Sequence, residues 1–150
     1  MNRTIFRFVI ALLTLFVILA FTLSRRSMFA AQSSQPITLT RLFTGSDGFS
    51  HVEDVPLNFS PETGESDHIK ASSAYVVRLP SGHFEDWHHA GRRRYVAPLS
   101  GHAEIEIANG EKVAIDPGHL YRAEDFTGKG HIFRVVGGAD WVAVFVDLDQ

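Results

Sequence analysis

The sequence contains no cysteine among its 150 residues. No disulfide can therefore form, and the cysteine content does not indicate whether the protein works in an oxidising compartment. We find no internal repeat either. A chain of this length is long enough for one domain with a hydrophobic core.

Positive charge is scarce outside the N-terminal 31 residues. Those residues hold four arginines and no acid (Arg3, Arg7, Arg25 and Arg26). The remainder therefore holds ten of the 14 Lys and Arg residues against all 17 Asp and Glu residues, a net charge of −7 with histidine neutral. A body this acidic, without a basic face or an interleaved aromatic stripe, is a poor nucleic-acid binder, so we expect no nucleic-acid partner.

Charge is missing altogether from the 15 residues between Val9 and Leu23. A helix from Phe8 to Ser24 would be about 25 Å long at 1.5 Å per residue, just short of a bilayer hydrocarbon core. We therefore expect an N-terminal hydrophobic helix that contacts a membrane through residues 8–24. It is either an uncleaved anchor or a cleaved signal; large residues at Met28 and Phe29, where cleavage needs small ones, favour the anchor.

The remaining organisation follows from this segment. We predict a signal peptide or membrane anchor with the start of a linker at residues 1–31, a linker at 32–36 and one β-domain at 37–150. The N-terminus is expected in the cytoplasm and the domain outside it, in a periplasmic or extracellular position. If the N-terminal segment is cleaved, the domain is secreted.

Short apolar runs between turn residues predict an all-β domain from Ile37 onward. The segment His102–Asp116 alternates apolar and polar residues, turns at Asn109-Gly110 and returns, which is the strongest hairpin signal in the chain. Other strand-like runs follow at eight- to twelve-residue spacing, with no convincing helix between them, and this spacing favours a sandwich or barrel. The looser stretch 45–67 is expected to hold one or two edge strands and a loop.

Two motifs resemble those of the cupin superfamily. The first cupin motif reads Gly, five residues, His-x-His, three or four residues, Glu, six residues, Gly. Here the positions are taken in order by Gly82, His88, Ala90, Arg94 and Gly101. The spacing is complete, but the second histidine and the glutamate are replaced.

The second motif, Pro-x-Gly-x-x-His followed by Asn, is matched at Gly128 and His131, whereas Phe126 and Val135 replace the other two residues. A subgroup of small single-domain cupins resembles this chain more closely, with Asp-Trp-His-x-Ala in one motif and Ala-Glu-Asp-x-Thr-Gly-x-Gly-His in the other. The resemblance covers about residues 37–148 and implies a single jelly-roll barrel with an internal pocket. It also makes a homodimer the expected assembly by analogy.

The same resemblance implies one divalent transition metal (Fe, Mn, Ni or Zn), with His88 and His131 as the surviving ligands. Arg94 argues against that cofactor, because a guanidinium stays protonated and repels a divalent cation. An arginine in a dry pocket instead suits a carboxylate or phosphate. Neutralisation of Arg94 by Glu85, Glu104 or Glu124 is a further reading that the sequence leaves open.

We therefore predict ligand-binding residues and not a defined catalytic set. They are His88, Arg94, His131, Asp125 and Tyr121, with Asp125 or Asp86 as the carboxylate that orients a histidine. The leading function is binding of a small polar or anionic organic molecule in the barrel, and whether catalysis follows is left open. The alternatives are a metal-dependent dioxygenase or isomerase that uses His88 and His131, and a non-catalytic interaction scaffold.

Overall fold

The computed structural model describes residues 36–149, in which every helix or strand assigned is a β-strand. The predicted all-β class is therefore confirmed for this part of the chain. The predicted N-terminal helix lies outside the described residues, and no helix within 36–149 is long and apolar enough to span a membrane. The strands are β1 (Thr38–Thr44), β2 (Ser50–Pro56), β3 (Ala71–Leu79), β4 (Phe84–His88), β5 (Arg94–Ser100), β6 (His102–Glu106), β7 (Lys112–Ala114), β8 (Leu120–Glu124), β9 (His131–Val136) and β10 (Trp141–Leu148).

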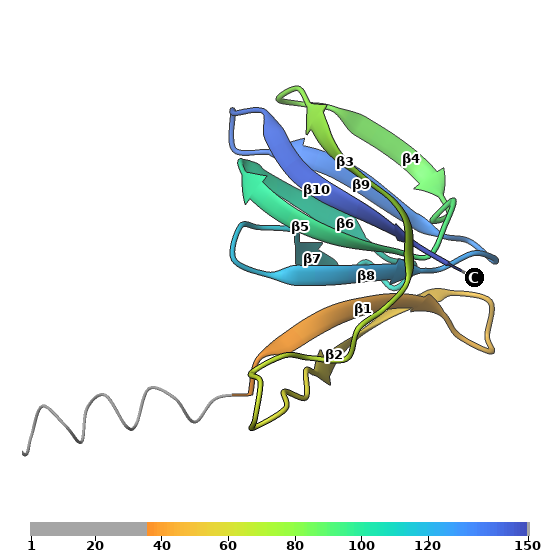
Figure 1. The fold of residues 1–150 in the computed structure, drawn as a ribbon. Coiled ribbons are helices and arrows are strands. Elements are labelled where there is room, and N and C mark those ends of the chain that lie inside the picture. Colours follow the sequence, from red (N-terminus) through yellow and green to blue (C-terminus); the bar gives the residue numbers. More distant parts are fainter. Residues whose placement is uncertain (1–35, 150) are drawn as a thin grey trace, which may run out of the picture. The chain divides into compact units, whose positions relative to one another are not determined.

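These strands form two sheets (Figure 1). The six-stranded sheet has the order β2-β1-β8-β5-β10-β3, and the four-stranded sheet has the order β4-β9-β6-β7. Strands β1 and β8 pair in parallel, and the other paired strands are antiparallel. Two sheets with a shared apolar interior agree with the predicted jelly-roll barrel.

The predicted hairpin at Asn109-Gly110 is confirmed by the pairing of β6 with β7. Glu104 lies opposite Ala114, and Ile105 lies opposite Val113. Gly110 has a φ of 84°, a left-handed conformation that glycine adopts without steric cost. Alternation along β6 then sends Ile105 into the interior and leaves Glu104 and Glu106 on the other face.

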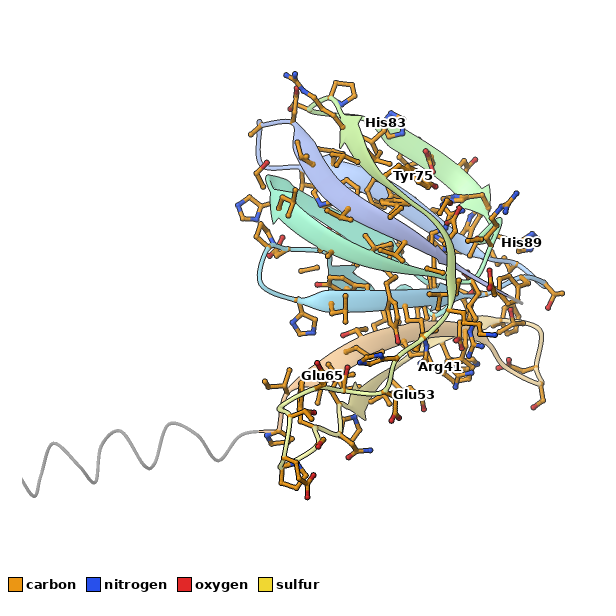
Figure 2. All side chains as sticks on the ribbon, in the orientation of Figure 1. Arg41, Glu53, Glu65, Tyr75, His83 and His89 are labelled. Carbon is orange, nitrogen blue, oxygen red and sulfur yellow. The ribbon has the colours of Figure 1, made fainter. Side chains whose placement is uncertain are left out.

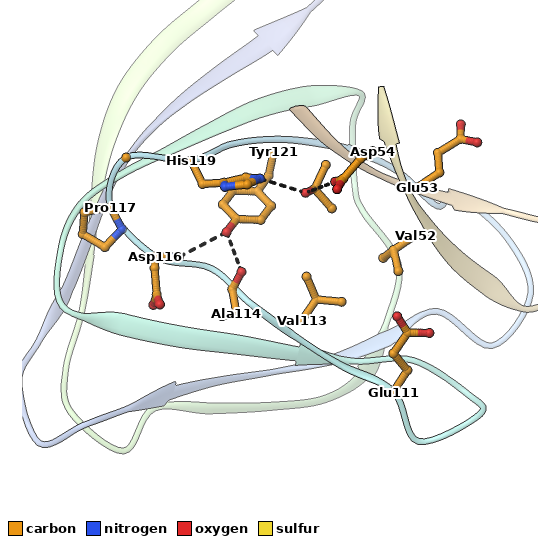
Figure 3. Close-up of a pocket in the computed structure, with 12 residues that line it drawn as sticks. Val52, Glu53, Asp54, Glu111, Val113, Ala114, Asp116, Pro117, His119 and Tyr121 are labelled. Carbon is orange, nitrogen blue, oxygen red and sulfur yellow. Dashed lines mark hydrogen bonds between the residues drawn. The ribbon is translucent and has the colours of Figure 1, made fainter. Parts of the chain in front are cut away.

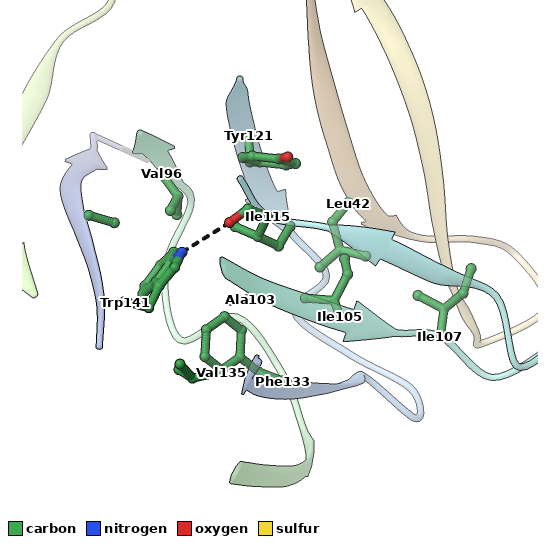
Figure 4. Packing of buried hydrophobic residues seen from close by; sticks show 11 residues of the cluster. Leu42, Val96, Ala103, Ile105, Ile107, Ile115, Tyr121, Phe133, Val135 and Trp141 are labelled. Carbon is green, nitrogen blue, oxygen red and sulfur yellow. Dashed lines mark hydrogen bonds between the residues drawn. The ribbon is translucent and has the colours of Figure 1, made fainter. Parts of the chain in front are cut away.

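The core is a cluster of aliphatic and aromatic side chains between the sheets (Figure 4). Trp141 is 1% exposed, packs edge-on against Phe133 at 5.2 Å between ring centroids, and donates its indole N–H to the Ile115 carbonyl oxygen at 3.0 Å. Burying an apolar side chain of this size stabilises the fold by roughly 1.5–3 kcal/mol. The interior is therefore held mainly by apolar contacts, and the indole is buried without an unpaired donor.

The loose stretch 45–67 contains one strand, β2, at the edge of the six-stranded sheet, as predicted, followed by a loop. β2 pairs only with β1, from Pro56 opposite Thr38 to Ser50 opposite Thr44. Its burial pattern is mostly exposed or half-buried, which is typical of an edge strand. Ser50, however, is 2% exposed, and its side chain contributes to the site described next.

Candidate functional site: a cavity between the two sheets

A cavity of about 340 Å³ lies between the sheets and is lined by side chains of both. Most of its wall is apolar, with Phe133, Trp141 and Phe145 among the lining residues. The polar groups gather where three strands begin or end: His88 ends β4, Arg94 begins β5, and His131 begins β9. The cavity therefore has an apolar body and one polar end, which is the usual character of a small-molecule site.

His88 and His131 meet because β4 and β9 are antiparallel neighbours. They are directly opposite one another in the register, and their ring centroids are 4.4 Å apart. A register shift between Glu85 and His88 shows that β4 bulges by one residue before this pair. The two spacing-matched histidines of the sequence motifs are thus brought together in the structure.

Gly130 allows this close approach. Its φ is 74°, and a Cβ atom at this position would lie 2.1 Å from the carbonyl oxygen of His88. A residue with a Cβ atom would therefore fit at this position only if the β4 backbone moved. The glycine shared with the cupin-like motif therefore has a steric role that explains its place beside the histidine pair.

His89 also lines the cavity, although strict alternation along an extended strand would send its side chain to the face opposite that of His88. The reason is that β4 ends at His88, so the two-residue period no longer applies. The His89 Nε2 atom lies 2.6 Å from the carbonyl oxygen of Gly128, and Figure 2 shows His89 just beyond the end of β4. This contact ties the loop after β4 to the loop before β9.

His131 is oriented by Asp125. Its Nδ1 atom lies 2.7 Å from Oδ2 of Asp125, and Asp125 is 0% exposed. Ser50 Oγ also donates to this oxygen at 2.9 Å, and the backbone N–H of Ala90 donates to Oδ1 at 3.3 Å. Because a carboxylate only accepts, Nδ1 carries the hydrogen, which leaves Nε2 of His131 free to act as an acceptor. Of the two carboxylates proposed from the sequence, Asp125 is thus the one placed behind a histidine.

His88 has acceptors on both ring nitrogens. Its Nδ1 lies 2.8 Å from the backbone oxygen of Asp86, and its Nε2 lies 3.1 Å from Oε2 of Glu85. The Glu85 carboxylate is shared with His83, whose Nε2 lies 3.0 Å from Oε1. Because the Asp86 carbonyl requires a hydrogen on Nδ1, His88 can also donate through Nε2 only as an imidazolium. Glu85 is a site residue that the sequence motifs did not indicate.

Arg94 lines the cavity, but none of the three proposed acids neutralises it. Its partner is Asp147, with Nε of Arg94 3.1 Å from Oδ1 of Asp147. Asp147 is the partner because β5 pairs with β10, which places Asp147 directly opposite Arg94. Ser73 of β3 donates to the other oxygen of Asp147 at 3.2 Å. No local sequence signal joins residues 94 and 147, so only the strand order reveals this pair.

Tyr121 lines the cavity with its ring, while its hydroxyl is engaged elsewhere. The hydroxyl donates to the backbone oxygen of Ala114 and accepts from the backbone N–H of Asp116 at 3.3 Å. Burial raises the pKa of this phenol above its ordinary value, so the hydroxyl stays protonated at neutral pH. Tyr121 thus offers a ligand an aromatic surface.

Glu124 belongs to a cluster of arginines. Alternation along β8 sends Tyr121 and Ala123 towards the cavity, and Arg122 and Glu124 to the other face. The Glu124 carboxylate lies within 2.6 Å of the Nε atoms of both Arg41 and Arg93, and 2.8 Å from that of Arg122. The cluster therefore balances Glu124 with its own cations, and of its members Arg122 alone also lines the cavity.

A second cavity, of about 530 Å³, opens beside the turn before β8 (Figure 3). Four carboxylates line it, from Glu53, Asp54, Glu111 and Asp116. Thr40 donates to Asp54 at 2.8 Å and lies 3.1 Å from the ring of His119. Thr40 and Tyr121 line both cavities, so these two side chains lie between the apolar site and the acidic one.

The donor set does not fit the divalent metal that the cupin resemblance implies. Both ring nitrogens of His88 already face protein oxygens, and Arg94, which lines the cavity, stands at the motif position where the cupin pattern has the carboxylate ligand. Within residues 36–149, no group of three or more His, Asp or Glu side chains is placed to hold a metal ion.

Comparisons with known proteins leave the activity open. No family model matches the chain, and no curated protein matches its sequence. Solved structures with similar folds include AerE from Microcystis aeruginosa, at 16% identity and a TM-score of 0.42 over 66% of this chain. The chain spans only 47% of the length of AerE.

Two further solved structures are similar to this chain. The cupin domain of Cnp3 from Schizosaccharomyces pombe is 10% identical, with a TM-score of 0.42 over 77% of this chain and 90% of that one. A predicted oxalate decarboxylase from Thermotoga maritima is 20% identical, with a TM-score of 0.38 over 78% and 96% of the two chains. At such TM-scores nothing about ligand or activity is carried over to this chain.

Proposed function

We propose that the β-domain binds a small polar organic molecule in the cavity between its two sheets, outside the cytoplasm. The observation that carries this proposal is the cavity itself, with its apolar body and a polar end formed by His88, His131 and Arg94. Whether turnover follows binding stays open. The location outside the cytoplasm depends on the hydrophobic N-terminal segment predicted from the sequence.

The geometry supports such a ligand in two ways. A ligand hydroxyl or amine can donate to Nε2 of His131, because Asp125 fixes the hydrogen on the other nitrogen. The aromatic rings of Phe133 and Phe145 provide a surface for the apolar part of the molecule. A few fixed polar groups in an apolar cavity are how proteins usually orient small ligands.

The test is a screen of small polar metabolites by thermal stabilisation of the full-length chain, followed by substitution. A true ligand should raise the melting temperature of the wild type, and this increase should be mostly lost in His131→Ala, which lacks the acceptor Nε2. The matched control is His102→Ala, because His102 is also paired with an acid, Asp116 at 3.0 Å, but does not line the cavity. Equal stabilisation of both variants would place the binding site elsewhere.

The metal-dependent alternative is tested by elemental analysis of the chain purified without a histidine tag. We expect substoichiometric iron, manganese, nickel and zinc, because Arg94 and the Glu85–His88 contact oppose a cation site. About one tightly held metal per chain would show that His88 rearranges, and oxygen-dependent and isomerase assays would then come first.

A further inference from the structure

The charge on the cavity wall decides which class of molecule can enter. Two arginines line the cavity within residues 36–149. The side chain of Arg122 leaves β8 on the face opposite Tyr121 and Ala123 and lies against Glu124 at 2.8 Å. Arg94 is therefore the arginine whose charge faces a bound molecule.

Arg94 is not available as an unpaired cation, because Asp147 lies against it. Asp147 is 5% exposed, and its Oδ1 atom is 3.1 Å from Nε of Arg94. The position of Asp147 on β10, two residues after Phe145, places both side chains on the cavity face of the strand. An anion that binds to Arg94 would have to compete with this buried carboxylate.

The pair is held by charge and not by hydrogen-bond geometry. Neither Nε of Arg94 nor Oδ1 of Asp147 has a hydrogen-bond partner among the described residues, although the two atoms are close. The guanidinium also rests 5.3 Å from the ring of Phe145. Because no hydrogen bond fixes this end of Arg94, removal of the charge on Asp147 would leave the guanidinium able to turn to a new partner.

The other titratable groups at this end are paired as well. Glu85 contacts His88 and His83, and Asp125 contacts His131. Glu85 itself lines the cavity, whereas Asp125 and Asp147 lie against the lining residues His131 and Arg94. His88, His131 and Arg94 each already face a carboxylate, so this end of the wall offers an anion no unpaired cation, although the arginine at the motif position alone suggested an anion site.

We infer that Asp147 makes this cavity selective for uncharged polar molecules, such as polyols, sugars or amides, over anions of the same size. This inference rests on the proposed function. An uncharged ligand leaves the Arg94–Asp147 pair intact, and it can still donate to Nε2 of His131. An anion would either separate the pair, leaving a buried carboxylate without its cation, or lie beside an Arg94 whose charge Asp147 already balances.

Quenching of Trp141 fluorescence tests the inference without a known ligand. Trp141 lines the cavity and is 1% exposed, and Trp87 is the other tryptophan of the chain. Trp87→Phe in the full-length chain, kept in a non-ionic detergent at pH 8, therefore leaves one reporter at the cavity. Three quenchers are compared at one ionic strength. Acrylamide is an uncharged amide, iodide is an anion, and caesium is a cation.

We expect acrylamide to quench Trp141 and iodide to quench it several-fold less. Asp147→Asn keeps the volume and can still accept from Ser73, and it should raise the iodide constant about threefold or more while the acrylamide constant stays unchanged. Arg94→Gln should act in the opposite direction, lowering quenching by iodide and raising quenching by caesium. The double variant, which lacks both charges, should return to the wild-type iodide value.

Two outcomes would overturn the inference, and they differ in what they leave standing. Equal quenching by iodide and acrylamide, unchanged in Asp147→Asn, would show an accessible cavity without charge selectivity, so the proposed function would survive. Failure of acrylamide to reach Trp141 in every variant would show a closed cavity, and both proposals would fall. If Asp147→Asn does not fold, as judged by circular dichroism, Arg94→Gln and the double variant still decide the charge effect.

Discussion

At the scale of single residues, Glu124 shows how a buried acid can be kept ionised. Burial by itself would raise the pKa of its carboxyl, but hydrogen bonds from Arg41 and Arg93 and the charge of Arg122 outweigh burial and leave the pKa below its ordinary value of 4.5. The Arg41 guanidinium also lies 4.4 Å from the ring of Phe43 and binds Glu53 at 2.8 Å. The cluster therefore links β1, β2 and β8 through charge.

This pKa shift predicts a pH dependence of stability. Since the folded-state pKa of Glu124 is lower than the unfolded-state value, its stabilising contribution is present above pH 4.5 and is lost as the pH falls through the folded-state pKa. Glu124→Gln should therefore destabilise the protein at pH 7 and flatten the decrease in stability below pH 4.5. Urea unfolding from pH 3 to 7 checks this; an unchanged pH profile in the variant would assign the acid sensitivity to other carboxylates.

At the scale of elements, the antiparallel pairing of β4 with β9 creates the histidine pair, and the tight turn before β9 permits it. Gly130→Ala should be strongly destabilising for two reasons. The φ of 74° costs a non-glycine residue about 1–2 kcal/mol, and the new Cβ atom would clash with the His88 oxygen. Chemical denaturation measures the total effect.

Gly82→Ala is the matched control for this element. Gly82 has a similar φ of 78°, but a Cβ atom there would have no neighbour within 4 Å. It should therefore show only the backbone cost of about 1–2 kcal/mol, and Gly130→Ala should exceed it by at least about 1 kcal/mol. Equal losses in the two variants would mean that β4 moves away from residue 130 without cost.

At the scale of the whole molecule, the N-terminal segment predicts where the domain works. A phosphatase that is active only outside the cytoplasm, fused to the C-terminus, should be active and remain in the membrane fraction after a carbonate wash. Deletion of residues 8–24 should abolish both properties, because those residues supply the apolar length that we predict to contact the bilayer. Active fusion in the soluble fraction, with a new N-terminus near residue 31, would show cleavage instead.

The homodimer expected from the cupin resemblance also stays a prediction at this scale.

The sequence by itself determined the fold class and part of the site. Turn residues at regular spacing and alternating runs such as His102–Asp116 predict strands, because a half-buried strand must alternate. The motif spacing then placed His88, Arg94 and His131 in one cavity. The strand predictions were confirmed because strand periodicity and glycine turns are local properties, which neighbouring residues encode.

The tertiary structure alone decided the partners of these residues. Asp147 faces Arg94 because β10 lies beside β5, and Ser50 reaches Asp125 from an edge strand 75 residues earlier in the chain. The end of β4 at His88 freed His89 from strand alternation. Each of these contacts depends on strand order or on where a strand stops, and those features follow from the packing of two sheets around a common core. The charge of the cavity, and with it the class of molecule we propose, therefore became visible only in the folded chain.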